Sequence, residues 1–296
     1  RGGICGEPSS LPSNRRPFVR WHMGGSAEGT VDADEVHKFG AFGSDWWEPN
    51  GPMKPLHSYN KVRCSFLNGM AQHLSLSRDA QGQPERLKSI KGLKVVDVGC
   101  GGGIFSEELC RMGLHVTAID AAPENIAVAT RHATEAGLLA SQAESQQGAS
   151  GGSLTFRHMT ADALASEVGE GFDLVVCSEV MEHVSDVPLM VRHLVSLLRP
   201  GGGLLVTTLN RTQLSYALSI VAAERILKLV PDGTHDWSKY ITPDELRNHM
   251  AENGLETKRL IGAAYNGISD EWYVVPETSV NYLMFATKPS KTDAQG

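Results

Sequence analysis

Short apolar runs alternate with amphipathic stretches through the middle of the chain. Runs rich in β-branched residues predict buried parallel strands at Leu93–Val98, His115–Ile119, Phe172–Cys177 and Gly203–Thr208. Apolar residues at helical spacing predict helices over Gly103–Met112, Glu124–Glu135 and Val187–Leu198. Strands that alternate with helices are typical of a mostly parallel sheet covered on both faces. We therefore expect a doubly wound α/β fold.

The flanking segments complete this architecture. Helical spacing of apolar residues predicts further helices over residues 31–47 and 60–77. Another helix is expected to begin at Thr242, because Pro243 suits the first helical position and Glu245 completes a capping box. Residues 255–264 and 280–287 are predicted as closing strands, which we expect to form an antiparallel pair at the edge of the sheet.

Two segments lie outside the pattern. Residues 1–30 contain four arginines and only two acids among Gly, Ser and Pro, which predicts a basic, disordered arm or the remnant of a mitochondrial transit segment. The folded domain is then expected over 31–296. Residues 140–153 are rich in Ser, Gln, Gly and Ala and predict a flexible surface loop.

Composition excludes several classes of protein. The chain has 296 residues, a net charge of −7 and a pI near 5.9, which argues against sequence-independent nucleic-acid binding. Its five cysteines form no Cys-x-x-Cys pair, so we expect reduced thiols and no disulfide framework. No stretch of the sequence is long and apolar enough to cross a bilayer.

A glycine-rich turn carries the strongest chemical signal. Gly99, Gly101 and Gly103 link a predicted strand to a helix, so the backbone can pass close to a ligand. Their spacing is G-x-G-x-G, unlike the G-x-G-x-x-G of dinucleotide sites. Asp120 ends the next strand, where a carboxylate can bind both ribose hydroxyls, and Asp162 is placed to meet an adenine amino group. The sequence predicts a nucleoside site; a tight turn without a ligand is the alternative.

Asp97 lies within the buried strand before the glycines. A buried carboxylate needs a partner. We expect it to bind backbone amides of the glycine turn, to hold the charged amino-acid end of the cofactor through water, or to do both.

An acidic cluster follows the strand Phe172–Cys177. If the chain becomes helical at Ser178, then Glu179, Glu182 and His183 fall on one helix face. Such a face suits a divalent cation, with Mg²⁺ favoured by the two carboxylates and Zn²⁺ or Mn²⁺ allowed by the imidazole. His183 could instead act as a general base. A solvated helix start is the third alternative.

These residues, together with others along the chain, resemble the ubiquinone-biosynthesis O-methyltransferases, and the mitochondrial members of that family in particular. The resemblance covers roughly residues 31–285. It rests on Trp46–Trp47, Lys54–His57, Asn60, Arg63, Asp97–Gly103, Glu179–Val184, Thr208–Arg211, Gly233–Asp236 and Val280–Tyr282.

The resemblance implies an S-adenosylmethionine-dependent O-methyltransferase with the class I methyltransferase fold. It implies that the methyl donor contacts Arg63, Gly99, Asp120 and Ser178. Ser178 replaces the bulkier residue expected in bacterial relatives, so its contact is expected through the backbone only. The resemblance also implies a magnesium site at Glu179, Glu182 and His183. The methyl acceptors would be a polyprenylated dihydroxybenzoate and a demethylated quinol.

A polyprenyl substrate lies in the bilayer, and the largely apolar run Leu214–Pro231 would let the enzyme reach it there. We expect a helical lid over about 212–240 that touches the membrane surface; a helix packed on the core is the alternative. The resemblance places the enzyme peripherally on the matrix side of the mitochondrial inner membrane, with other ubiquinone-biosynthesis proteins as partners. The competing classes are another small-molecule methyltransferase, a nicotinamide-dependent oxidoreductase and a catalytically silent member of a biosynthetic complex.

Overall fold

The computed structural model describes residues 2, 29–78, 84–139, 151–219 and 236–290. The predicted basic arm therefore lies almost wholly outside the described residues. So do most of the predicted loop at 140–153 and the central part of the predicted lid, 220–235.

In the described residues, eight strands form one mixed sheet in the order β5-β4-β3-β6-β7-β10-β8-β9. The strands β5 to β7 run parallel, whereas β10, β8 and β9 each run antiparallel to their neighbours. Their bounds are β3 Lys94–Val98, β4 His115–Asp120, β5 Ser153–His158, β6 Phe172–Ser178, β7 Leu198–Leu209, β8 Glu256–Asn266, β9 Glu271–Val275 and β10 Asn281–Thr287. A short separate hairpin pairs β1 (Ser77–Arg78) with β2 (Pro84–Glu85).

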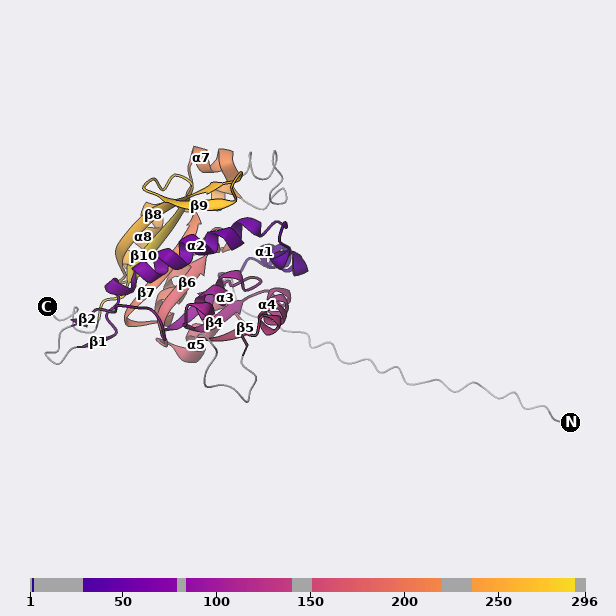
Figure 1. Cartoon of the computed structure of the whole chain (residues 1–296), viewed down its shortest axis with the longest axis horizontal. Coiled ribbons are helices and arrows are strands. Elements are labelled where there is room, and N and C mark those ends of the chain that lie inside the picture. The colour runs from indigo at the N-terminus through magenta and orange to yellow at the C-terminus, as the bar shows by residue number, and fades with distance from the viewer. Residues whose placement is uncertain (1, 3–28, 79–83, 140–150, 220–235, 291–296) are drawn as a thin grey trace.

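Helices cover both faces of the sheet (Figure 1). The α-helices are α1 Ala33–Gly40, α2 Lys54–Gly69, α3 Ile104–Arg111, α4 Pro123–Glu135, α5 Ala161–Val168, α6 Val187–Leu197, α7 Gln213–Ser215 and α8 Pro243–Glu252. Short 3-10 helices are η1 Gly43–Trp47, η2 Ala71–His73, η3 Met181–His183 and η5 Trp237–Lys239. The helical conformation of α7 continues to residue 219.

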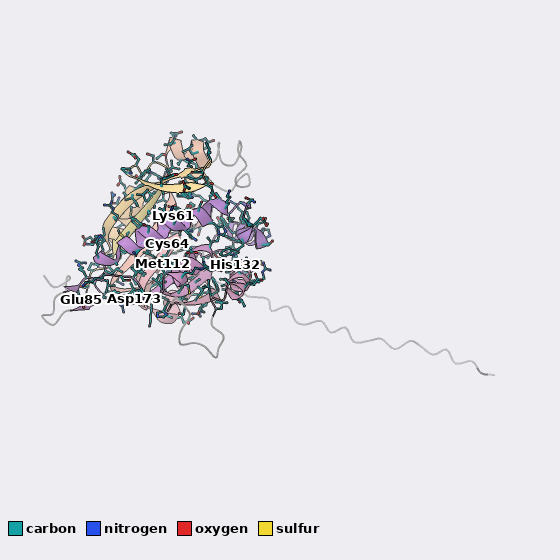
Figure 2. All side chains as sticks on the ribbon, viewed as in Figure 1. Lys61, Cys64, Glu85, Met112, His132 and Asp173 are labelled. Atoms are coloured by element: carbon teal, nitrogen blue, oxygen red, sulfur yellow. The ribbon has the colours of Figure 1, made fainter. Side chains whose placement is uncertain are left out.

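Successive side chains of the buried strands pack into two separate hydrophobic cores, one on each face of the sheet. In β3, Val95 packs with α2 and α3, whereas Val96 packs with α5 and α6. Cys64 and Met112, which pack against the first of these cores, lie on the side of α2 in Figure 2. Both faces are apolar, as a sheet covered on both sides requires. The predicted doubly wound class I methyltransferase fold with an antiparallel edge is confirmed.

The helix predicted over 31–47 is wrong as a single element. It divides into α1 and η1 because Gly43 adopts a left-handed conformation, with φ of +52°, that ends the helical path. The helix predicted over 60–77 in fact begins at Lys54 and ends at Gly69. Its earlier start is compatible with Pro55, since proline is tolerated in the first helical turn.

The two predicted closing strands pair with each other, but not at the edge. β10 lies between β7 and β8, and the edge strand at this end of the sheet is β9, which the sequence analysis missed. Trp272–Val275 is a short run of aromatic and β-branched residues that the sequence analysis passed over, and only Trp272 and Val275 of β9 are half-buried. The capping box predicted at Thr242 is confirmed, with reciprocal bonds between Thr242 and Glu245 at the start of α8.

Candidate active site

A cavity lies where the strand order reverses. β3 pairs with β4 on one side and with β6 on the other, so the chain leaves their carboxyl ends in opposite directions and opens a crevice. A cavity of about 530 Å³ occupies this crevice. It is lined by Arg63, Asp97, Gly99, Gly101, Asp120, Ser178, Glu179, Glu182 and His183.

The glycine turn presents bare backbone to this cavity. Gly99 and Gly101 have φ values of +73° and +54°, which L side chains rarely adopt. A Cβ atom on Gly99 would lie 2.5 Å from Val180 Cγ2, and one on Gly101 would lie 2.3 Å from Trp46 Cη2. Both positions therefore require glycine, because the indole of Trp46 and the segment after β6 close directly onto the turn.

Asp120 ties the turn to the next helix. Its carboxylate accepts hydrogen bonds from the backbone N–H of Gly101 at 2.8 Å, from that of Ala122 at 2.8 Å and from Asn125 Nδ2 at 3.1 Å. Asn125 in turn accepts a bond from Trp46 Nε1 at 3.0 Å. Burial raises the pKa of the Asp120 carboxyl. Its position at the end of β4, on the cavity wall, is the one that the ribose prediction requires.

Arg63 and Ser178 connect the two halves of the cavity. The Arg63 guanidinium is buried, and its Nη1 donates to Ser178 Oγ at 2.9 Å. Ser178 Oγ lies 2.7 Å from Thr207 Oγ1, which donates to Glu179 at 2.6 Å. The Ser178 hydroxyl is thus part of a polar chain, although the sequence analysis expected only its backbone to act. Within the described residues, Arg63 Nε is buried without a partner, which fits an anionic group of a bound ligand.

Asp97 binds a side chain where backbone amides of the turn were expected. It accepts a 2.6 Å bond from Ser106 Oγ, at the start of α3. Burial raises the pKa of the Asp97 carboxyl to about 6. The carboxylate that binds the turn is instead Asp120, through the amide of Gly101.

Asp162 is the predicted site residue that lies away from the cavity lining. It is an exposed residue in the first turn of α5. The residues just before it, Met159, Thr160 and Ala161, do line the cavity. An adenine contact from the Asp162 side chain stays a prediction.

The acidic cluster does not form the helix face that its spacing suggested. Ser178 ends β6, Glu179 has a φ of +56°, and only Met181–His183 make a 3-10 turn. The premise of a helix from Ser178 is therefore wrong. Each carboxylate instead reaches a threonine of β7, Glu179 at Thr207 (2.6 Å) and Glu182 at Thr208 (2.7 Å).

Burial and the nearby charge of Glu182 raise the pKa of the Glu179 carboxyl. His183 turns in another direction, with Nδ1 2.9 Å from Glu35 Oε2. The imidazole lowers the pKa of Glu35 to about 2, so Glu35 stays an acceptor. As placed, no group of three His, Cys, Asp or Glu side chains in the described part of the chain could hold a metal ion.

The structure adds site residues that the sequence analysis did not single out. They are Glu35, Asn125 and Thr207. Local spacing gave no signal for Glu35 or Asn125, since their partners His183 and Trp46 lie 148 and 79 residues away. Trp46 and Thr208 did belong to the strings that carried the family resemblance, but without any role.

We expect Asp97→Asn to reduce the loss of stability that accompanies a rise in pH. The folded protein holds this proton up to pH about 6, whereas the unfolded carboxyl releases it near 3.8, so stability falls as the pH rises between these values. Between pH 5 and pH 7 the wild type should lose about 1 kcal/mol more than the variant. Urea unfolding at both pH values measures this, with the exposed Asp34→Asn as the control. Equal slopes for wild type and Asp97→Asn would contradict the buried, proton-holding state of Asp97.

We expect Asp120→Asn to weaken binding of S-adenosylmethionine by about 1–3 kcal/mol, the scale of a lost hydrogen bond to a charged group. Asparagine keeps the size of the side chain but replaces one acceptor oxygen by a donor. Isothermal titration calorimetry measures the affinity, and a thermal melt checks that the variant is folded. An unchanged affinity in a folded variant would remove Asp120 from the donor site.

Solved structures support the fold. The chain is similar to the magnesium protoporphyrin IX methyltransferase of Synechocystis PCC 6803 with bound SAM, with a TM-score of 0.53 and 18% identity over 88% of this chain and 99% of that one. The same enzyme with bound SAH gives a TM-score of 0.50 and 20% identity over 78% and 83% of the two chains. At this identity the likeness shows the fold alone.

The sequence itself carries the family. Residues 70–260 match a methyltransferase domain model. The ubiquinone biosynthesis O-methyltransferase of Azorhizobium caulinodans is 41% identical over 92% of this chain and 99% of that protein. The protein of the same name from Chelativorans sp. is 39% identical over 88% and 95% of the two chains. The chain therefore belongs to the ubiquinone biosynthesis O-methyltransferase family and is an S-adenosylmethionine-dependent O-methyltransferase.

Proposed function

We propose that the cavity holds the methyl donor against the glycine turn and a catechol or quinol hydroxyl of a polyprenylated ubiquinone precursor against Glu179, Glu182 and His183. The acceptors would be a polyprenyl dihydroxybenzoate and a demethylated ubiquinol. One observation carries this proposal: a single cavity is lined by the glycine turn on one wall and by the acidic cluster on the other. The chain Arg63–Ser178–Thr207–Glu179 joins the two walls by hydrogen bonds.

The reaction needs orientation and the removal of one proton. The phenolic oxygen attacks the methyl carbon in line with the sulfonium bond, the methyl passes from sulfur to oxygen, and neutral S-adenosylhomocysteine leaves without acid assistance. The rigid turn and Asp120 fix the donor, and this positioning supplies a large part of the rate. The phenolic proton leaves toward the acidic wall. Burial and the nearby charge of Glu182 raise the pKa of the Glu179 carboxyl, which makes it a stronger base than an ordinary carboxylate, and the imidazole of His183 is the other proton acceptor on this wall.

We also propose that Glu179, Glu182 and His183 bind Mg²⁺ or another divalent cation. The donor set supports this, because two carboxylates and an imidazole line one cavity and carboxylate oxygens suit a hard cation. In the present arrangement the three side chains contact Thr207, Thr208 and Glu35. When bound, the cation would make the acceptor hydroxyl easier to deprotonate.

With a labelled methyl donor and a panel of short-chain catechols, we expect methyl transfer that EDTA abolishes and added Mg²⁺ restores. Donor affinity should stay nearly unchanged, because the donor lies on the glycine side of the cavity. Glu182→Gln keeps the size and the contact with Thr208 but removes a charge, so it should raise the metal concentration needed for half-maximal turnover.

Asp34→Asn, an exposed acid outside the cavity, serves as the control. Full activity in metal-free buffer would contradict the magnesium proposal and leave His183 as the base. Absence of transfer to every catechol, with and without metal, would contradict the proposed acceptor class.

We propose that the lid region brings the enzyme to the membrane surface. Leu214 and Leu218 are 50% and 47% exposed, and Leu218 also lines the cavity, so an apolar surface lies beside the site. No helix among the described residues is long and apolar enough to span a membrane.

Replacement of Leu214 by serine should lower co-sedimentation with liposomes, because it removes apolar area from the surface that would enter the lipid interface and leaves the cavity lining unchanged. Activity on a short, water-soluble catechol should survive. The matched control replaces Ile268, which is fully exposed on the turn between β8 and β9. Joint loss of liposome binding and of activity on the soluble catechol would indicate a helix that packs on the core.

A location on the matrix side of the mitochondrial inner membrane, with partners from the same pathway, completes the proposal. It is supported by the basic composition of residues 1–30 and by the membrane origin of the substrate. Cell fractionation with protease protection of the isolated mitochondria tests the location; recovery of the enzyme outside the mitochondria would contradict it.

A further inference from the structure

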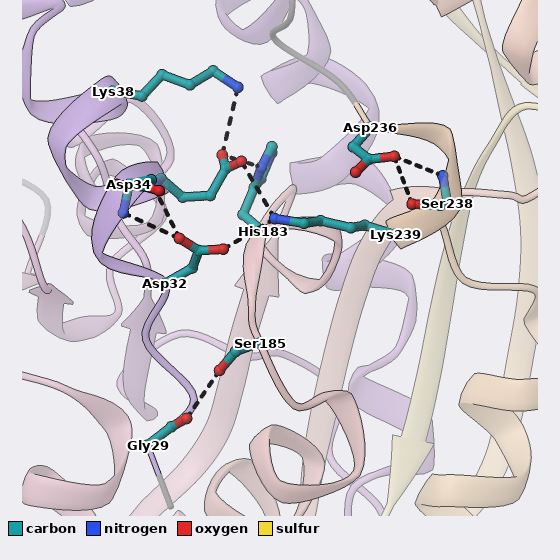
Figure 3. A network of polar contacts seen from close by, with 10 residues as sticks. Gly29, Asp32, Asp34, Lys38, His183, Ser185, Asp236, Ser238 and Lys239 are labelled. Atoms are coloured by element: carbon teal, nitrogen blue, oxygen red, sulfur yellow. Dashed lines mark hydrogen bonds and ion pairs between the residues drawn. The ribbon is translucent and has the colours of Figure 1, made fainter. Parts of the chain in front are cut away.

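The residues that precede α1 are paired to the segment that follows β6. Val31 and Val184 form an antiparallel β-bridge, and the backbone N–H of Ser185 donates to the carbonyl of Thr30 at 3.1 Å. Ser185 Oγ also donates to the carbonyl of Gly29 at 2.9 Å, a contact visible in Figure 3. These backbone contacts fix the start of α1 against the acidic wall of the cavity.

This pairing brings Glu35, in the first turn of α1, to His183. Glu35 Oε2 lies 2.9 Å from His183 Nδ1, and the side chains of Glu35 and His183 are only 17% and 13% exposed. The ring of Phe39, one helical turn further along α1, packs edge-on to the imidazole at 4.7 Å between centroids. The imidazole is therefore held by a charge-assisted bond and an aromatic contact from one helix. Both Glu35 and His183 line the cavity.

The Glu35 carboxylate is itself held in place. Lys239 Nζ, from η5, lies 3.6 Å from Glu35 Oε1 and 3.0 Å from Asp32 Oδ2. Lys38 Nζ lies 3.5 Å from Glu35 Oε2. Asp32 also caps α1 by accepting from the backbone N–H of Asp34 and Glu35 (Figure 3). Three separate parts of the chain thus meet around one carboxylate.

A carboxylate at Nδ1 determines what the other ring nitrogen can do. A neutral imidazole carries one N–H, and an ionised carboxylate can only accept, so the hydrogen is kept on Nδ1. Nε2 then bears the lone pair and can take a proton from a phenol or bind a cation. Removal of a carboxylate that holds a ligating histidine typically lowers activity or metal affinity by about 10–100-fold.

We propose that Glu35 is the positioning residue of the acceptor site: it holds the His183 imidazole in the Nδ1–H tautomer with Nε2 available to the methyl acceptor or its cation. Asp32 and Lys239 support Glu35. The inference rests on the proposed role of His183 in the acceptor site. It assigns no contact between Glu35 and the substrate.

The test compares Glu35→Ala, Glu35→Gln, His183→Ala and the control Asp34→Ala. Asp34 is an exposed acid in the same first turn, so its loss changes the charge of α1 equally. We expect Glu35→Ala to lower kcat on a soluble catechol by about 10–100-fold. The Kd for the methyl donor should change less than twofold. Glu35→Gln should recover much of the rate, because its amide oxygen still accepts from Nδ1–H. Asp34→Ala should match the wild type.

A second measurement does not depend on activity. In ¹⁵N-histidine-labelled protein at a pH where the imidazole is neutral, His183, assigned by comparison with His183→Ala, should show the Nδ1–H tautomer. Glu35→Ala should convert it to a mixture. An Nε2–H tautomer in the wild type, or a Glu35→Ala enzyme with unchanged kcat and tautomer, would overturn the inference.

The roles of His183 and Glu35 can be tested separately. If His183→Ala retains full turnover, the proposed acceptor role of His183 is wrong, and the inference falls with it. If His183→Ala is inactive while Glu35→Ala behaves as the wild type, only the positioning role is wrong.

Discussion

The guanidinium of Arg63 is almost completely buried between the two walls of the cavity, and a buried cation must be compensated by polar partners. Its Nη2 donates to the carbonyl of Leu56 and to Asn60 within α2. Its Nη1 donates to Ser178, which is joined through Thr207 to Glu179 on the acceptor side. Phe105 and Tyr59 pack on the guanidinium at 4.3 and 5.1 Å and exclude water from it. The geometry of either wall thus depends on the other, and both depend on the register between β6 and β7.

The parts of the fold that the sequence predicted are those with a local physical signature. A strand buried on both faces must be apolar throughout, which is why β3, β4, β6 and β7 could be placed from composition alone. β9 has a shorter apolar run, Trp272–Val275, and its side chains are largely exposed at the edge of the sheet, so it differs from the strands that are buried on both faces. The division of 31–47 depended on one glycine torsion, which periodicity does not encode.

In the site, too, the residues that could be predicted are those with a local physical signature. Gly99, Gly101 and Asp120 were found because a tight turn and a strand end impose residue types at fixed positions. The arrangement of Glu179, Glu182 and His183 was predicted wrongly because it assumed a helix, whereas the left-handed Glu179 turns the chain toward β7. Glu35 and Asn125 could not be found at all, because their roles arise from tertiary contacts.

The ion pair between Asp32 and Lys239 joins residues 207 positions apart in the chain. Closing so long a loop costs conformational entropy that local contacts do not repay, and non-local contacts of this kind form late in folding. The glycine turn, by contrast, is completed by Asp120, 19 residues away from Gly101. During synthesis the contact between Gly101 and Asp120 can therefore form before the C-terminal third of the chain has emerged. The support of Glu35 must wait until Lys239 has emerged, so in a nascent chain the glycine turn closes before the acceptor wall of the cavity is complete.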